Sequence, residues 1–494
     1  EPGMLGEIDE QVRQWAREAA EAAGLIRKPR GKNKFLYEKE KDQAARRLIL
    51  NIVRPGETYL IRSSGTRKGS GTFYTKPQLA VPTVRRTLEP LLYKISEEDG
   101  KRKLTPKSPE EILSVKICDP AMGSGSFLVA SLNYVTDALY ESLLSRNRFK
   151  KTREGTAIVL PFGKPSEAQV KEELVKRSID DELFETSTKA QLKRYVVERC
   201  IYGVDINPLA VELAKLSLWI ETMDRELPFG FLDHKLKAGN SLIGCWFDQF
   251  QEYPLMAWKR EGGDKDHVGI HHAKGEWTGR IKAIFNEQVR PELAKIIRGQ
   301  RTLESWEYGN DVKVQAIFER AVQLFEELHE IPLSGDGHER REVFYRDRIQ
   351  MDEGLRALRD RFDLWCAVWF WPGEWLDADM PTPQNFYSTP TSVLHRSRKV
   401  ARHMQFFHWE LEFPDVFITG KGGFDAVVGN PPWEASKPVS KEFFTLYDPI
   451  YRTYGKQEAL SHQKELFQRD RAIEEAWVAY NATFNAMTNW VKRA

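Results

Sequence analysis

The sequence predicts an α/β fold built around a mostly parallel sheet. Three short apolar stretches have the character of buried strands, and each runs into a turn: Ser114–Asp119, Cys200–Ile206 and Ala426–Val428. The first two are followed at once by apolar or amphipathic helices, over Phe127–Leu144 and Leu209–Met223. Strands that alternate with helices in this way are typical of βαβ units, in which neighbouring strands run parallel.

Chain length and charge indicate how many domains to expect and what kind of partner is favoured. A chain of 494 residues is too long for a single core and indicates roughly two to four domains. The 74 basic and 72 acidic residues nearly cancel, so the distribution of charge is more informative than its sum. Basic clusters occur at Arg27–Lys34, Arg67–Lys68, Lys101–Lys107 and Arg396–Arg402, and together they weakly favour a polyanionic partner.

Cysteine spacing and hydropathy bear on the compartment. The four cysteines lie far apart, which argues against a disulfide framework and against a zinc site, so the sequence implies no metal and a reducing cytoplasm. The longest apolar stretch, Leu364–Trp371, is much shorter than the roughly 20 residues that span a membrane. No signal-peptide pattern opens the chain. We expect a cytoplasmic protein without a membrane partner.

The first part of the chain reads as a helical region over residues 1–62. It is followed by the glycine-rich loop Arg67–Pro77 and by a helix with a clear apolar stripe over Leu79–Leu92. Thr75 is a good N-cap, and Pro77 is tolerated in a first helical turn. A loop that runs into a helix N-terminus can receive an anion.

Two segments interrupt the predicted sheet. Residues 146–197 read as a charged helical insertion, with helices over Glu167–Arg177 and Lys189–Arg199. Residues 250–404 read as a helical subdomain, whose core is formed by the tryptophan-rich stretch Leu364–Trp375. Sheet-like sequence resumes at Phe406–Glu412. The predicted α/β domain is therefore discontinuous and consists of residues 63–145, 198–249 and 405–494.

Two of the strand ends indicate a nucleoside ligand. The turn after Asp119 lacks the Gly-x-Gly-x-x-Gly spacing, which disfavours NAD and FAD, and by itself it reads equally well as an ordinary tight turn. Asp205 stands at the carboxyl end of the next strand, where an acidic residue commonly accepts both hydroxyls of a ribose. The interval of 86 residues (205 − 119 = 86) exceeds the usual spacing of about 20. The charged insertion accounts for the surplus.

The turn after the third strand, Asn430–Trp433, suits a flat ring that carries an amine. Its prolines restrict φ and have no N–H, so the side chain of Asn430 and the carbonyl of Pro431 can both face outward as acceptors. Trp433 adds a face on which a ring can stack.

Taken in order, these motifs resemble those of the amino-group DNA methyltransferases of the gamma class, which methylate adenine N6. The motifs that carry the resemblance are Phe73–Thr75, Asp119–Phe127, Gly203–Asp205, Gly239–Ser241 and Asn430–Trp433. The resemblance covers residues 67–145, 198–245 and 406–435. It implies a Rossmann-like, seven-stranded, S-adenosylmethionine-dependent methyltransferase sheet with large helical insertions, as in type IIG restriction-modification enzymes. Methyltransferases of BREX and DISARM phage-defence systems also resemble this chain.

The resemblance implies a role for each matching residue. Phe73, Tyr74 and Thr75 would close on the methionine end of S-adenosylmethionine, Asp119 would bind its ammonium, and Asp205 its ribose. The full implied cofactor set is Phe73, Tyr74, Thr75, Asp119, Ala121, Gly123, Ser124, Gly125, Phe127, Asp205, Ile206, Asn240 and Ser241. Asn240 stands where relatives often carry Asp. The implied catalytic set is Asn430, Pro431, Pro432 and Trp433, which would hold an adenine flipped out of double-stranded DNA.

Several alternatives stay open. The same turn occurs in enzymes that methylate RNA or a protein glutamine. Methylation at cytosine N4 is a further alternative, although a Ser-Pro-Pro start is commoner for it, and a non-catalytic DNA-binding or scaffold subunit could keep the fold. Residues 1–66 show no Pro-Asp followed by Glu-x-Lys, so we expect no nuclease there. The chain begins at Glu1, and about 60 residues follow Trp433. We therefore expect a part of a larger polypeptide, with DNA-sequence recognition supplied by a further region or by another subunit of a defence system.

Overall fold

A computed structural model of the chain provides the coordinates. The residues that the structure describes are 2–26, 34–49, 74–98, 100–162, 169–222, 232–250, 253–258, 311–332, 337–372, 379–383, 385–386, 389–418, 422–432, 438–448 and 450–493, with residue 375 and a few isolated positions between 283 and 294. Among the described residues, no helix combines the length and the hydropathy that a membrane span requires.

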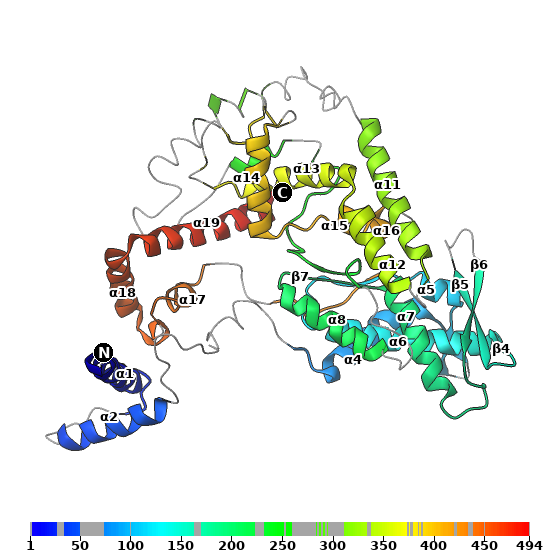
Figure 1. Ribbon diagram of the computed structural model, residues 1–494, viewed down its shortest axis with the longest axis horizontal. Helices are drawn as coiled ribbons and strands as arrows, with labels where there is room; N and C mark the ends of the chain where they lie inside the picture. Colours follow the sequence, from blue (N-terminus) through cyan, green and yellow to red (C-terminus); the bar gives the residue numbers. More distant parts are fainter. Residues whose placement is uncertain are drawn as a thin grey trace. The chain divides into compact units, whose positions relative to one another are not determined.

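The central sheet, of which Figure 1 labels β7, has four parallel strands in the order β8-β7-β3-β9. The strands are β3 (Ile117–Asp119), β7 (Ile201–Asp205), β8 (Leu236–Ala238) and β9 (Ala426–Val427). Ile117 pairs with Ile201 on one side and with Ala426 on the other. The predicted α/β class and the parallel sheet are confirmed. The described part of this sheet has four strands, so the seven-stranded sheet stays a prediction.

Side chains of the central strands alternate between two cores, as the two-residue period of a strand requires. Ile117 and Ile201 point into one core together with α4 (Pro77–Leu92), α6 (Ser126–Ser145), α7 (Phe184–Cys200) and α8 (Pro208–Thr222). Cys118, Tyr202 and Val204 point into a second core, which contains Phe407 and Phe413. The sheet is thus covered on both faces, as expected of parallel strands.

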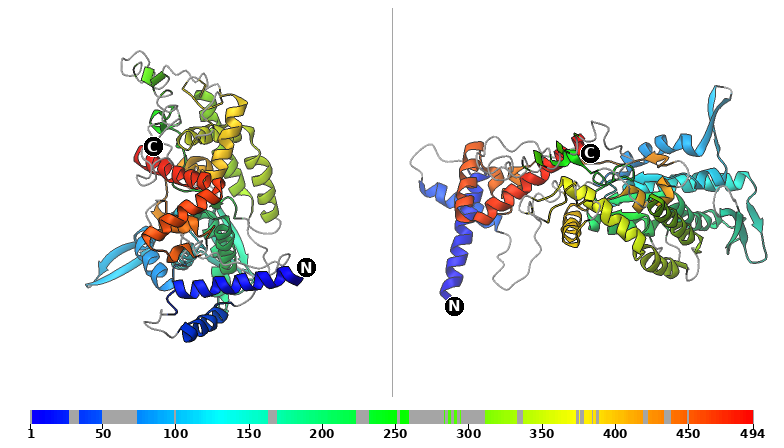
Figure 2. Two further views of the ribbon diagram at one scale, coloured as in Figure 1. Left: turned by 90° about the vertical axis from the view of Figure 1, so that its left-hand side faces the viewer. Right: turned by 90° about the horizontal axis from the view of Figure 1, so that it is seen from above.

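An antiparallel hairpin follows α4. It consists of β1 (Tyr93–Glu98) and β2 (Lys101–Pro106), and Figure 2 shows it projecting from the body of the α/β unit. The short helix α5 (Pro109–Leu113) then leads back into β3, capped by a reciprocal pair of hydrogen bonds between Ser108 and Glu111.

The prediction that residues 146–197 are helical is wrong in its first part. This segment forms an antiparallel sheet of β4 (Phe149–Lys151), β5 (Thr156–Phe162) and β6 (Gln169–Val175), and only then the expected helix α7. The predicted helix over Glu167–Arg177 is rich in helix-forming residues. Pairing with the aliphatic strand β5, which buries Ile158 and Leu160, overrides that local propensity.

The described part of the second insertion is largely helical, as predicted. Its elements are η2 (Leu255–Trp258), α11 (Asp311–Glu330), α12 (Gly337–Phe344), the π-helical turn η5 (Tyr345–Gln350), α13 (Glu353–Trp369) and α14 (Thr391–Met404). Trp365, Trp369 and Trp371 are at most 5% exposed and pack together in its core. The tryptophan-rich stretch is therefore core, as predicted.

Residues 406–412 do not form the expected strand. Phe406 makes a single parallel bridge with Asn240, and the chain then turns into α15 (Trp409–Glu412) and α16 (Pro414–Phe417). His408 has its Nδ1 occupied by the backbone N–H of Cys245 at 3.0 Å. This hydrogen bond holds residues 406–412 beside the segment that follows β8. In the described part of the chain, no strand pairs with residues 406–412.

The chain divides into two compact units, described separately here. One holds residues 70–261, 275–435 and 486–494, including the sheet and the helical insertion. The other holds residues 1–69, 262–274 and 436–485, so residues 436–485 group with the N-terminal helices and not with the predicted α/β domain. Its elements are α1 (Pro2–Ala22), α2 (Lys34–Leu48), α17 (Ser440–Phe444), η7 (Tyr451–Thr453), α18 (Lys456–Arg469) and most of α19 (Arg471–Arg493). The predicted helices of residues 1–49 are confirmed, and residues 50–62 lie outside the described residues.

Candidate functional site

Four strand ends meet at one edge of the sheet. Because the strands are parallel, Asp119 of β3, Asp205 of β7 and the residues that follow β8 and β9 all emerge on the same side. β3 lies between β7 and β9 in the sheet. The next parallel strand along the chain, β7, is its neighbour on one side, and the much later strand β9 is its neighbour on the other. Ligands of open α/β sheets bind in the crevice at such a reversal of strand order.

The glycine turn after β3 is anchored to β7. The N–H of Met122 donates to the carbonyl of Val204 at 3.0 Å, and the N–H of Gly123 donates to Asp205 Oδ2 at 2.9 Å. Gly123 and Gly125 have φ of 54° and 85°, a region that favours glycine. A Cβ at Gly123 would meet no atom within 4 Å, whereas one at Gly125 would lie 3.3 Å from the Cβ of Ala214. The turn therefore packs on α8 at Gly125 and leaves open space beside Gly123.

Asp119 connects this turn to the turn after β9. Its side chain is 1% exposed, and Oδ1 accepts the N–H of Ala121 at 3.1 Å. A Cβ on Gly429 would lie 2.5 Å from that same Oδ1, so only glycine fits directly before Asn430. Burial raises the pKa of Asp119 to about 7, with a further contribution from the nearby charge of Asp205.

Asp205 is tied to the main chain on both carboxylate oxygens. Oδ1 accepts the N–H of Asn207 at 2.8 Å, and Oδ2 accepts that of Gly123. The adjacent Ile206 is 46% exposed at the strand end. The carboxylate thus holds the glycine turn in place, a role that sequence reasoning missed. Each oxygen retains a second lone pair for another donor.

Asn240 is largely enclosed by the segment that follows α14. It is 7% exposed, its N–H donates to the carbonyl of Gln405 at 2.7 Å, and its Oδ1 accepts the N–H of Leu242 at 3.2 Å. The carbonyl of the neighbouring Ser241 accepts the indole N–H of Trp409 at 3.1 Å. Segments more than 160 residues apart therefore build this part of the edge.

The turn after β9 meets the loop before α4. The N–H of Val428 donates to the carbonyl of Cys118 at 2.9 Å, which fixes the start of the turn beside β3. Asn430 is exposed, and its Nδ2 donates to Thr75 Oγ1 at 3.3 Å across 355 residues of sequence. Two predicted motifs that are far apart in the sequence, one catalytic and one for the cofactor, are thereby in contact.

The remaining predicted residues divide into three groups. Tyr74, Pro431 and Pro432 are exposed, and Ala121 and Ser124 are partly exposed in the glycine turn. Phe127 is 6% exposed and belongs to the core beside α6, not to the open edge. Phe73 and Trp433 lie outside the described residues.

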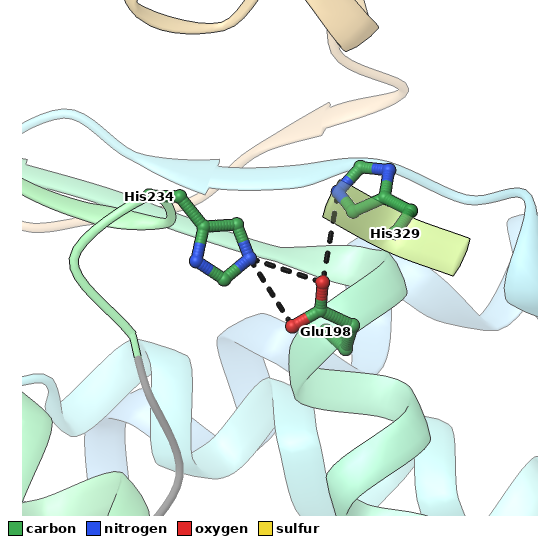
Figure 3. A group of neighbouring side chains, drawn as sticks. All are labelled: Glu198, His234 and His329. Carbon is green, nitrogen blue, oxygen red and sulfur yellow. Dashed lines mark hydrogen bonds and ion pairs between the residues drawn. The ribbon is translucent and has the colours of Figure 1, made fainter. Parts of the chain in front are cut away.

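Sequence reasoning missed a buried cluster of charged groups at the β8 side of the sheet. Figure 3 shows Glu198 of α7 with His234 and His329 around its carboxylate. His234 Nε2 lies 3.0 Å from Glu198 Oε1, and His329 Nε2 lies 3.6 Å from it. One ligand atom from each of the three lies within 4.8 Å of the others, a spacing that a metal ion can use. The sequence did not anticipate this grouping.

A guanidinium already holds the carboxylate of this cluster. Arg341 of α12 is 1% exposed and bonds Glu198 directly, and its Nη1 donates to the carbonyl of Ile331 at 2.9 Å. Burial opposes the ionisation of Glu198, but the electrostatic attraction of Arg341 and His234 is stronger. It holds the pKa of Glu198 well below its usual range. Burial lowers the pKa of His234 despite the adjacent carboxylate. We interpret the cluster as an ion-pair network between α7 and the helical insertion.

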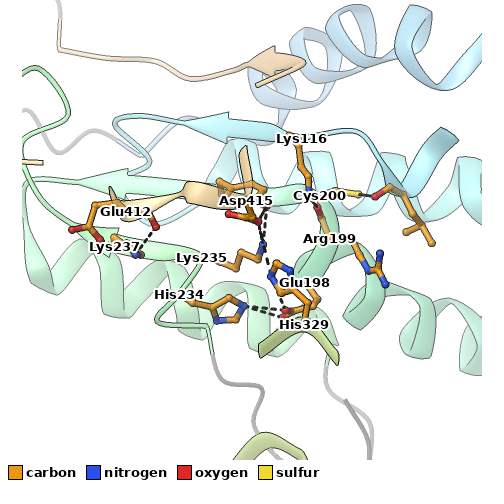
Figure 4. Close-up of polar contacts among 12 residues, drawn as sticks. Lys116, Glu198, Arg199, Cys200, His234, Lys235, Lys237, His329, Glu412 and Asp415 are labelled. Carbon is orange, nitrogen blue, oxygen red and sulfur yellow. Dashed lines mark hydrogen bonds and ion pairs between the residues drawn. The ribbon is translucent and has the colours of Figure 1, made fainter. Parts of the chain in front are cut away.

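Two more ion pairs extend this network along β8 (Figure 4). Lys235 Nζ lies 3.2 Å from Asp415 Oδ2, and Lys237 Nζ lies 2.7 Å from Glu412 Oε2. Burial lowers the pKa of Lys235 to about 8. A cavity of about 520 Å³ adjoins the second pair and is lined by α8, β8 and insertion residues, among them Lys237, Arg359 and Glu412. Arg359 also pairs with Glu412, so the charges along this wall neutralise one another.

The chain is similar to known restriction-modification proteins. The family model described as "Eco57I restriction-modification methylase" matches residues 199–468. A protein of Methanocaldococcus jannaschii with the name "Putative type II restriction enzyme and methyltransferase RM.MjaORFECS2P" is 22% identical over 429 residues, which is 77% of this chain and 30% of that protein. The chain therefore spans about a third of the length of that relative. No solved structure matches the chain.

Proposed function

This chain belongs to the Eco57I restriction-modification methylase family, and from that premise we propose that it transfers a methyl group from S-adenosylmethionine to N6 of adenine in double-stranded DNA. The observation that carries the proposal is the contact between Asn430 and Thr75 at the strand-end edge. It places the amide expected to bind the target beside the loop expected to bind the cofactor.

The residues at this edge fit S-adenosylmethionine. The space beside Gly123 lets the main chain approach a ligand closely, and buried Asp119 offers a carboxylate for an ammonium. Asp205 has lone pairs for ribose hydroxyls, and Asn240 lies at the end of β8 for the adenine ring. When bound, the cofactor supplies an electrophilic methyl group on a sulfonium sulfur. Phe73, Tyr74 and Thr75 would hold its methionine end.

Asn430 and Pro431 would position the target amine. The exocyclic nitrogen of adenine is a poor nucleophile because its lone pair is delocalised into the ring. Asn430 Oδ1 and the carbonyl of Pro431 would each accept one amine hydrogen and orient the nitrogen lone pair, and the nitrogen then loses one proton to solvent. The hydrogen bond from Asn430 Nδ2 to Thr75 Oγ1 supports this assignment, because it holds the amide beside the loop expected to bind the cofactor. Trp433 would stack on the flipped base, an interaction worth about 1–3 kcal/mol.

The first prediction is the chemical identity of the product. We expect the protein, given radiolabelled S-adenosylmethionine and unmodified double-stranded DNA, to incorporate label that nucleoside analysis identifies as N6-methyladenine. RNA and bulk protein, offered in parallel at equal mass, are expected to remain unlabelled. Label in N4-methylcytosine, in RNA or in glutamine would overturn the proposed substrate, and cofactor binding without any transfer would favour a non-catalytic subunit.

The second prediction concerns pH. Asp119 must be ionised to bind an ammonium, and its pKa is about 7, so cofactor affinity should rise with pH up to about 7, by at most tenfold per pH unit. Above about pH 8 the α-amino group of the cofactor loses its proton, and affinity should fall again. Calorimetric titration between pH 5.5 and 9 measures this profile. The control is Asp119→Asn, which should bind weakly and lack the acidic limb; an unchanged profile in that variant would remove Asp119 from the ammonium site.

The proposal extends to organisation and setting. Residues 70–145, 198–249 and 405–435 would form the methyltransferase domain, with 1–69, 146–197, 250–404 and 436–485 as added regions. A DNA substrate places the activity in the cytoplasm, and restriction-modification or phage defence is the process that the family suggests. Other subunits of such a system would be its protein partners.

A further inference from the structure

Helix α14 carries an unusual charge pattern. Its sequence over Thr391–Met404 contains four Lys or Arg and two His residues, and no Asp or Glu. The neighbouring α13 mixes both signs, with Glu353, Asp360 and Asp363 among its arginines. A solvated helix usually mixes signs in this way, because neighbouring opposite charges stabilise it. Because α14 contains basic but no acidic residues, its composition favours an acidic partner outside the helix.

The packing of α14 fixes which side chains face outward. Val393, Ser397, Val400, Ala401 and Met404 are buried, and the helix crosses α13 (Figure 1). Nε and Nη2 of Arg398 donate to the two carboxylate oxygens of Asp360 at 2.7 and 2.6 Å. This bidentate ion pair joins one side of α14 to α13. Arg396 lies over the ring of Trp375.

Among the residues that the structure describes, two cations on the outer face of α14 have no acidic partner. Lys399 and Arg402 are exposed, and within the described residues neither lies within ion-pair distance of a carboxylate. The contact recorded for Arg402 is from Nε to the carbonyl of Arg398 at 3.2 Å. Lys399 and Arg402 are three residues apart, which places their Cβ atoms about 5–6 Å from each other on one face of the helix. His395 and His403 are exposed on the same face, each four residues from Lys399.

The end of α14 is joined to the candidate site. Its C-cap residue Gln405 accepts the backbone N–H of Asn240 at 2.7 Å, and Phe407 donates to the carbonyl of Ile243 at 2.8 Å. Asn240 follows β8 at the strand-end edge. The basic face therefore belongs to a helix that is anchored directly at the edge where the base and the cofactor are proposed to meet.

We infer that the outer face of α14, formed by His395, Lys399, Arg402 and His403, binds the phosphate backbone of the DNA whose adenine is methylated. This inference rests on the proposed function. Each strand of duplex DNA has one phosphate per about 3.4 Å of helix axis, so two long cationic side chains that leave one helix face at neighbouring positions can each contact a phosphate. The face offers charge but no grouping of side chains that reads base edges. It holds DNA of any sequence, while the choice of target lies elsewhere.

The test measures the salt dependence of DNA binding. The double variant Lys399→Ala/Arg402→Ala should bind a 30-base-pair duplex roughly tenfold more weakly at 150 mM salt than the unaltered protein. The slope of log affinity against log salt should decrease by about 1.8, because two phosphate contacts are lost. The loss should be equal for duplexes of different sequence. Thermal unfolding, expected to be unchanged, reports that the fold is intact.

A matched control comes from α18, where exposed Lys464 and Arg469 lie on a helix that also carries Glu458 and Glu465. Lys464→Ala/Arg469→Ala should leave the salt slope unchanged. An equal loss in both variants, an unchanged slope in the α14 variant, or a loss confined to RNA would overturn the assignment of this face. Methylation of DNA by the unaltered protein is assayed separately. If it occurs while the α14 slope is unchanged, the inference fails and the proposed function stands; a protein that neither binds nor methylates DNA refutes both.

Discussion

Asn430→Ala is expected to lower the rate of methyl transfer to DNA by at least about 10²–10³-fold, the usual cost of losing a hydrogen bond that positions a reacting group. The variant removes the acceptor for one amine hydrogen and the donor to Thr75. Cofactor affinity should change only a few-fold, because Asn430 is proposed to touch the base. Single-turnover transfer and calorimetric cofactor binding separate the two effects.

Thr75 provides the matched comparison for this prediction. Thr75→Ser keeps the hydroxyl that accepts from Asn430 Nδ2, whereas Thr75→Val keeps the shape and loses it. If the hydroxyl orients the amide, the valine variant should lose transfer rate and the serine variant should be close to the unaltered protein. A fully active Asn430→Ala protein would refute the catalytic role of the turn.

Arg341→Ala is expected to destabilise the unit that contains the sheet by about 3–5 kcal/mol, the usual cost of removing one partner of a buried ion pair. Arg341 and Glu198 are 1% and 5% exposed, so Glu198 would keep a buried charge with only the histidines beside it. Urea unfolding followed by tryptophan fluorescence measures the change. The control is Arg346→Ala, whose partner Asp347 is exposed, so the loss of this solvated pair should leave stability nearly unchanged.

Two further readouts distinguish lost charge pairing from lost packing. The double variant Glu198→Gln/Arg341→Met removes both charges and should recover most of the loss. In Arg341→Ala, the pKa of Glu198 should rise because the guanidinium no longer lowers it, so the loss of stability should be smaller at pH 5 than at pH 8. A loss that is independent of pH and unrelieved in the double variant would show that Arg341 acts through its packing alone.

Local sequence was sufficient for three of the four strands whose ends meet at the site, but not for β8. The predicted strands at Ser114–Asp119, Cys200–Ile206 and Ala426–Val428 correspond to β3, β7 and β9, and the helices after the first two correspond to α6 and α8. These segments combine an apolar run with a turn directly after it, and that local signal persists in the folded chain. The failures at residues 167–177 and 406–412 arose where pairing with a distant segment decided the outcome.

By itself the sequence determined the class of fold, the order of the motifs and the family to which the resemblance pointed. These follow from residue types over short spans, where hydrophobic period and turn chemistry act locally. Only the tertiary structure decided which motifs touch: Thr75 with Asn430, Asp119 with Gly429, and Asp205 with Gly123. It alone also revealed the buried pairing of Glu198 with Arg341 and the anchoring of α14 beside Asn240. Contacts between residues tens to hundreds of positions apart depend on how the whole chain packs, because no local pattern encodes the partner of a buried charge.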